Sequence, residues 1–189
     1  MVRFLALALA SSLIAFPARA DLQLSPKPVE HMLDGAKLTE LAFSDGGSKS
    51  VTYKPPHGWE CTGTSNQLTL RPPKAHQAQA IISKAPLPDP AEFNEKITQK
   101  LVDEAVAGVP KGSLNVTVVS REKNPLMIDG KETFLVVMSY NFYNEIYRRS
   151  ILFLNRPGEQ IRFQLTCHQA DFDQLQKAFL RSHYTWQNL

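Results

Sequence analysis

The chain has 189 residues, 43% of them hydrophobic, with 21 Lys and Arg against 18 Asp and Glu. Two of the three excess positive charges come from Arg3 and Arg19, in a segment that we expect to be removed, so the remaining chain carries only +1. So small a charge excludes the strong basic bias that is typical of nucleic-acid-binding proteins.

The first 20 residues have the three parts of a secretory signal peptide. Arg3 supplies the positive start, residues 4–16 form an apolar run, and residues 18–20 read Ala-Arg-Ala, a small-residue cleavage site. The run is shorter than the roughly 20 residues that a membrane span needs. We therefore predict cleavage before Asp21 and an exported protein, periplasmic or extracellular, with no transmembrane segment in the mature chain.

The exported chain has 169 residues (189 − 20), a length that suits one domain. Residues 21–36 are marked by proline and are predicted to form an extended N-terminal lead-in, followed by a single α+β domain over residues 37–189. Within that domain, alternation of apolar and polar residues between turn residues predicts strands. The predicted strands are 37–43, 50–54, 59–62, 67–71, 78–86, 113–121, 131–143, 146–155 and 160–169.

The longest helical pattern follows the fifth of these strands. Asp89 is predicted as its N-cap, with Pro90 at the first helical position and Glu92 completing a capping box. The apolar stripe of this helix comprises Phe93, Ile97, Leu101 and Ala105. Gly108 is predicted to end it.

Several strands then precede one last helix. Asp129-Gly130 predicts a tight turn, and Asn144-Glu145 is predicted as a hairpin tip. The last helix covers residues 171–184, with Asp171 as its cap and Phe172, Leu175 and Phe179 as its buried stripe. Consecutive strands with short connections predict an antiparallel sheet, and the amphipathic helices must cover it. The predicted fold class is α+β.

Three features of the sequence resemble the PsbP-like group, which includes photosystem extrinsic proteins and many bacterial exported proteins. They are the segment "YKPPHGW" at residues 53–59, a middle helix followed by a hairpin, and the closing block "RFQLTCHQADFDQLQKAFLRSHYTW" at residues 162–186. The resemblance covers roughly residues 37–187. It implies an antiparallel sheet sandwiched between helices (an α/β/α sandwich) and no shared catalytic set. It carries no photosystem partner to this chain, because the sequence has no thylakoid address.

The two cysteines, Cys61 and Cys167, are an even pair in a chain bound for an oxidising compartment. Such a pair favours a disulfide. The neighbouring Cys167-His168 could instead suggest a thiol and its base. Adjacent residues of a strand point to opposite faces, however, so the histidine should face away from the sulfur. We therefore predict a Cys61–Cys167 disulfide.

No catalytic, metal or cofactor site is predicted. The five histidines show no spacing that would gather them into one metal site, and each is interpreted as a surface or helix-capping residue. His183, near the end of the last helix, is placed to complement the helix dipole. The chain has no nucleophile elbow and no phosphate-binding glycine loop.

One hairpin, "YNFYNEIYRR", combines the residue types that are enriched in binding hot spots. The candidate interaction patch comprises Tyr140, Phe142, Tyr143, Tyr147, Arg148 and Arg149. The competing interpretation is that these rings cover the sheet beneath a helix.

The sequence therefore favours a non-enzymatic binding or accessory protein of the cell envelope or extracellular space, with another protein or envelope assembly as its partner. The alternative is a small-ligand carrier or enzyme whose polar site is assembled from loops near His57 and Trp59. A deep cleft with convergent polar groups would favour this alternative.

Overall fold

A computed structural model describes residues 22–33, 36–46, 50–89 and 92–188. The predicted signal peptide lies outside the described residues. The elements in chain order are β1 (Leu22–Leu33), β2 (Ala36–Asp45), β3 (Ser50–Tyr53), β4 (Glu60–Gly63), β5 (Gln67–Arg71), β6 (Gln79–Leu87), α1 (Glu95–Ala107), β7 (Leu114–Lys123), β8 (Thr133–Phe142), β9 (Glu145–Arg156), β10 (Gly158–His168), α2 (Gln169–His183) and β11 (Gln187–Asn188).

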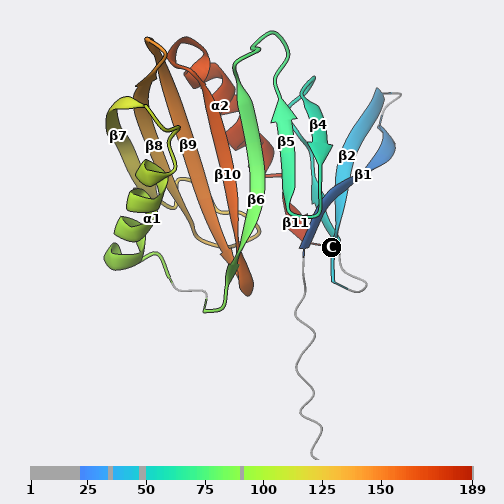
Figure 1. Cartoon of the computed structure of the whole chain (residues 1–189). Coiled ribbons are helices and arrows are strands. Elements are labelled where there is room, and N and C mark those ends of the chain that lie inside the picture. Colours follow the sequence, from blue (N-terminus) through green and yellow to red (C-terminus); the bar gives the residue numbers. More distant parts are fainter. Residues whose placement is uncertain (1–21, 34–35, 47–49, 90–91, 189) are drawn as a thin grey trace, which may run out of the picture.

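The strands form two antiparallel sheets (Figure 1). The large sheet has the order β4-β5-β6-β10-β9-β8-β7, and the small sheet has the order β1-β2-β3-β11. The segment expected as a lead-in is extended, and it is also an integral strand: β1 pairs with β2, and Leu22 and Leu24 are fully buried in the core.

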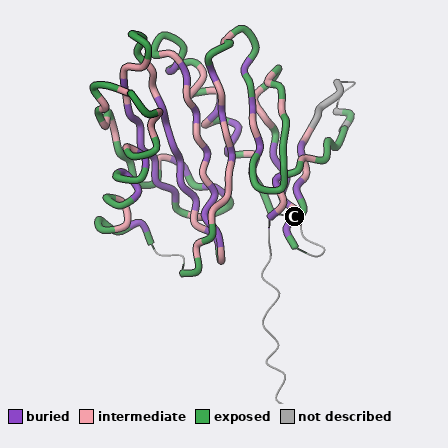
Figure 2. The backbone as a smooth tube through the Cα atoms, viewed as in Figure 1, coloured by how far each residue is buried: buried purple, intermediate pink, exposed green. Residues whose placement is uncertain are grey.

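The main core lies between one face of the large sheet, helix α2 and the small sheet. Phe163 and Leu165 of β10 point into it, as the alternation of that strand predicts. Trp186 closes it, with its ring 5.2 Å from that of Phe163 and 5.7 Å from that of Phe43 in the small sheet. Figure 2 shows this burial along the central strands.

Helix α1 packs on the opposite face of the large sheet over a second, smaller core. It packs mainly on β7 and β8 and reaches β10 through the ion pair of Glu104 with Arg162, so this face is only partly covered (Figure 1). The expected antiparallel sheet with helices on it is present, but the α/β/α sandwich is incomplete. The protein is also richer in strands than that description implies, because the small sheet lies with α2 on the same side of the large sheet.

Both helices begin at other residues than predicted. Asn94, not Asp89, is the N-cap of α1, where its side-chain oxygen accepts a hydrogen bond of 3.0 Å from the backbone N–H of Ile97. Helix α2 begins at Gln169, ahead of the predicted cap Asp171, and follows His168 directly. The predicted stop of α1 at Gly108 is confirmed.

Candidate functional site

The hairpin between β8 and β9 turns through Tyr143 and Asn144, one residue earlier than predicted. Both residues have positive φ angles, 50° and 62°. A two-residue turn of this kind favours Gly, which has no Cβ, and Asn, whose short side chain hydrogen-bonds locally, whereas other residues are strained there by roughly 1–2 kcal/mol. Tyr143 is nevertheless a bulky residue in this conformation, and it is 86% exposed.

Two further apolar side chains lie beside this turn. Leu114 of β7 pairs with Asn141 of β8, and Asn141 pairs with Ile146 of β9, so all three lie in one row across the sheet. Leu114 is 67% exposed and Ile146 is 42% exposed. We call Leu114, Tyr143 and Ile146 the tip surface. The predicted patch did not include Leu114 and Ile146, because alternation along a strand does not show which of its positions lie beyond the buried core.

A hollow of about 540 Å³ adjoins the tip surface, between the hairpin and the start of α2. It is lined by Asn144, Glu145, Ile146, Arg148, His168, Gln169, Ala170 and Asp173. Charged side chains of both signs face it, Arg148 on one side and Glu145 and Asp173 on the other. Arg148 Nη1 lies 3.6 Å from Asp173 Oδ1, and His168 Nε2 lies 3.8 Å from Glu145 Oε2. The end of the large sheet thus presents an apolar ridge with a polar hollow beside it.

The structure divides the predicted interaction patch. Tyr143 is exposed, and Phe142, Tyr147 and Arg148 are half-buried. Tyr140 and Arg149, by contrast, are only 1% and 8% exposed, so their assignment to an interaction surface was wrong. They lie on the face that α1 partly covers, where the Arg149 guanidinium stacks on the Tyr140 ring at 5.6 Å.

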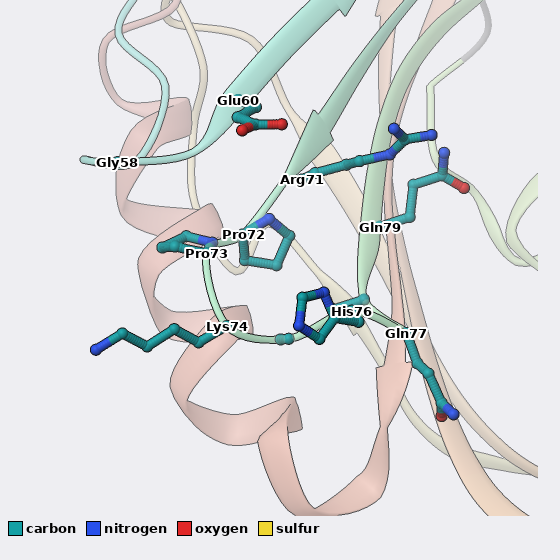
Figure 3. Close-up of a pocket in the computed structure, with 11 residues that line it drawn as sticks. Gly58, Glu60, Arg71, Pro72, Pro73, Lys74, His76, Gln77 and Gln79 are labelled. Carbon is teal, nitrogen blue, oxygen red and sulfur yellow. The ribbon is translucent and has the colours of Figure 1, made fainter.

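The alternative site near His57 and Trp59 does not assemble around those two residues. His57 is exposed, whereas the Trp59 ring turns inward and stacks on Phe179 at 5.9 Å. A pocket of about 550 Å³ does lie beside them, lined by Gly58, Glu60 and the loop from β5 to β6 (Figure 3). Its charged side chains, among them Glu60 and Arg71, are exposed to solvent.

The Cys61–Cys167 disulfide is contradicted by the structure, in which both residues are free thiols. Strands β5 and β6 separate β4, which carries Cys61, from β10, which carries Cys167. Three strand spacings amount to about 14 Å, and a disulfide needs Cα atoms within about 7 Å. The predicted orientation is confirmed: Cys167 is fully buried, and His168 points to the other face, with its ring 5.6 Å from that of Tyr147.

Both thiols should therefore react with a thiol reagent only after denaturation. Burial raises the pKa of Cys61 to about 11 and that of Cys167 to about 12, so neither forms a reactive thiolate near neutral pH. We expect two thiols per chain in protein denatured without a reducing agent, and one in a Cys61→Ser variant. Absence of free thiols in the wild-type chain would contradict the strand order.

No group of three or more His, Cys, Asp or Glu side chains in the described ranges is arranged to hold a metal ion. Within the same ranges, no helix has the length and apolar character of a membrane span.

No protein-family model matches this sequence, and no curated protein sequence matches it. Solved structures do show a similar fold. LpqN of Mycobacterium tuberculosis, a protein involved in cell envelope biogenesis, has a TM-score of 0.54 at 12% sequence identity, over 88% of this chain and 91% of LpqN.

Two other solved structures match over most of their length. Cyanobacterial PsbP (CyanoP) of Synechocystis sp. PCC 6803 has a TM-score of 0.49 at 11% identity, over 95% of this chain and 96% of CyanoP. PA94 of Pseudomonas aeruginosa, a protein of unknown function, has a TM-score of 0.46 at 16% identity, over 84% of this chain and 94% of PA94. A PsbP protein is thus among the structural matches, as the sequence resemblance predicted. Identities this low establish a shared fold alone.

Proposed function

We propose that this protein is an exported, non-enzymatic accessory protein that binds a protein partner of the cell envelope through the tip surface. Export rests on the apolar run at residues 4–16 and the small-residue site that follows it. A role in the envelope is compatible with LpqN, which has a similar fold and is involved in cell envelope biogenesis.

The observation that carries the proposal is the conformation of Tyr143. A residue that served only the turn would be Asn or Gly, since these adopt positive φ at little cost. Tyrosine is strained there, and its ring contact with Phe142, at 4.4 Å, still leaves 86% of the residue exposed. Strain that is retained at an exposed aromatic side chain indicates a function for that side chain.

The surroundings of Tyr143 favour a protein over a membrane as the partner. The hollow beside it is lined by the cation Arg148 but also by the carboxylates Glu145 and Asp173. An anionic lipid surface would select for a basic patch, whereas charges of both signs around apolar anchors are typical of a protein interface.

Replacing Tyr143 with glycine should separate stability from binding. Glycine relieves the positive-φ strain but raises the conformational entropy of the unfolded chain. These two effects oppose each other, so the free energy of unfolding should change by no more than about 1 kcal/mol. An aromatic anchor lost from an interface costs about 2 kcal/mol or more, so partner affinity should fall by roughly thirtyfold. Urea denaturation and affinity measurement on the same samples check both effects.

Tyr184 is the matched control, because it is also an exposed tyrosine, 62% accessible, at the end of α2. A photo-crosslinking residue at position 143 should give one discrete adduct with the envelope fraction. The adduct should disappear when Leu114 and Ile146 are changed to serine. A photo-crosslinker at position 184 should give no such adduct, and equal labelling from both positions would refute the proposal.

A further inference from the structure

The Arg149 guanidinium is buried without a carboxylate partner. It is 8% exposed; its Nε donates a 3.0 Å hydrogen bond to Thr166 Oγ1, and its Nη1 donates a 2.6 Å hydrogen bond to the backbone carbonyl of Gly108. No carboxylate oxygen of the described residues lies within ion-pairing distance of it. The Tyr140 side chain also hydrogen-bonds to Arg149, so the hydrogen-bond partners of this guanidinium are all neutral groups.

Arg156, another buried arginine of β9, has the carboxylate partners that Arg149 lacks. Arg156 is 9% exposed, and it pairs with two buried carboxylates, Asp45 and Glu159. Arg149 has only the carboxyl end of α1, worth about half a negative charge, and the face of the Tyr140 ring. A buried cation is costly unless it is paired, so part of the charge on Arg149 remains uncompensated.

Arg149 lines a cavity of about 280 Å³ that we call the α1-side cavity, on the sheet face that α1 leaves partly uncovered (Figure 1). The apolar part of its lining comprises Ile81, Ala105, Ile151 and Phe153. The hydrogen-bonding part comprises Gln67, Ser83 and Gln164. Gly108, Arg162 and Glu104 complete it, and the last two neutralise each other through an ion pair of 3.0 Å.

We propose that the α1-side cavity binds a small organic carboxylate. The carboxylate pairs with the Arg149 guanidinium, and a short apolar part of the ligand lies on Ile151 and Phe153. The single uncompensated guanidinium suits a monoanion. A phosphate dianion suits the cavity less, because Glu104 and the apolar side chains also line it. This site does not depend on the partner proposed for the tip surface.

The test is an NMR titration of the ¹⁵N-labelled mature chain with sodium hexanoate, hexanamide and inorganic phosphate. Hexanoate should give saturable shifts confined to amide signals around the cavity, such as those of Gly108, Ser83 and Gln164. Hexanamide has the same chain without the charge, and should give at least tenfold weaker binding. Scattered or unsaturable shifts with hexanoate, or saturation by phosphate alone, would overturn the proposal.

Variants at two adjacent arginines locate the charge that matters. Arg149→Met should weaken hexanoate binding at least tenfold. Arg148→Met, on the opposite face of β9, should leave binding unchanged. If Arg149→Met does not fold, Arg149→Lys, which keeps the charge but loses the planar fork, should show the loss instead. Equal affinity in the wild type and in the folded Arg149 variant would overturn the proposal.

Discussion

Replacing Arg156 with methionine is expected to lower the free energy of unfolding by about 3–5 kcal/mol. Arg156 Nη1 lies 3.1 Å from Glu159 Oε1, and its other terminal nitrogen contacts a carboxylate oxygen of Asp45. Asp45 is 5% exposed and Glu159 is 7% exposed. Without the guanidinium, two buried carboxylates would stay together in a poorly solvated site. Urea denaturation followed by circular dichroism measures the loss.

The position of this cluster explains why the expected effect is large. Asp45 ends β2 in the small sheet, whereas Arg156 and Glu159 belong to β9 and β10 in the large sheet. Asn188 of β11 also accepts a hydrogen bond of 3.4 Å from Arg156. One guanidinium therefore joins the two sheets at the edge of the main core, and its loss should weaken their contact as well as expose the charges.

Arg162→Met is the matched control for this prediction. Arg162 also pairs with a glutamate, Glu104, at 3.0 Å, but the two side chains are 36% and 39% exposed. An exposed pair contributes about 1 kcal/mol or less. Replacing Asp45, Arg156 and Glu159 together with apolar residues should recover most of the stability lost in the single variant. Equal losses in Arg156→Met and Arg162→Met would contradict the cluster's role.

Alternation within single strands could be read correctly from the sequence. Strand β10 places Phe163, Leu165 and Cys167 in the core and His168 on the other face, as expected. The turn at Asp129-Gly130 was also predicted, and its two residues have φ angles of 50° and 71°. These features depend on neighbours in the chain, which the sequence displays directly.

Features that depend on distant contacts could not be read in this way. The disulfide prediction was wrong because strand order in the sheet, β4-β5-β6-β10, leaves no trace in local patterns. The same limit applies to Tyr140 and Arg149: alternation groups them on one face, but it does not say that α1 and the sheet bury that face. The turn at Tyr143 was misplaced by one residue because its chemistry is unfavourable for the turn.

His183 differs most from its sequence interpretation. It was expected to complement the dipole of the last helix as a charged or capping residue. It is instead 1% exposed, with its ring 4.4 Å from the rings of both Phe163 and Phe179. Neither of its ring nitrogens has a hydrogen-bond partner in the described ranges. Burial lowers the pKa of His183 to about 3, so the ring is neutral in the folded protein and cannot serve the dipole.

Replacing His183 with leucine is therefore expected to raise the free energy of unfolding by about 1–3 kcal/mol at pH 7, because it removes two buried polar atoms that lack partners. The gain should grow on acidification. The unfolded chain binds a proton at His183 with a pKa near 6.5, whereas the folded chain does not bind it until about pH 3. Protonation of His183 in the unfolded chain therefore costs the wild-type protein little stability well above pH 6.5, and it lowers the free energy of unfolding by about 1.4 kcal/mol per pH unit at most as the pH falls below 6.5. His183→Leu lacks this loss.

The difference between the two proteins isolates His183 from the other groups that titrate in acid. Urea denaturation at pH 7, 6 and 5 should show stability curves that diverge as the pH falls. His76→Leu, a change of an exposed histidine in the loop from β5 to β6, removes no buried polar atom, so it should not reproduce the gain of His183→Leu at pH 7. Parallel curves for His183→Leu would mean that the ring takes up a proton in the folded protein. A loss of stability at pH 7 would mean that a ring nitrogen has a buried partner, such as an ordered water molecule, and that the core depends on it.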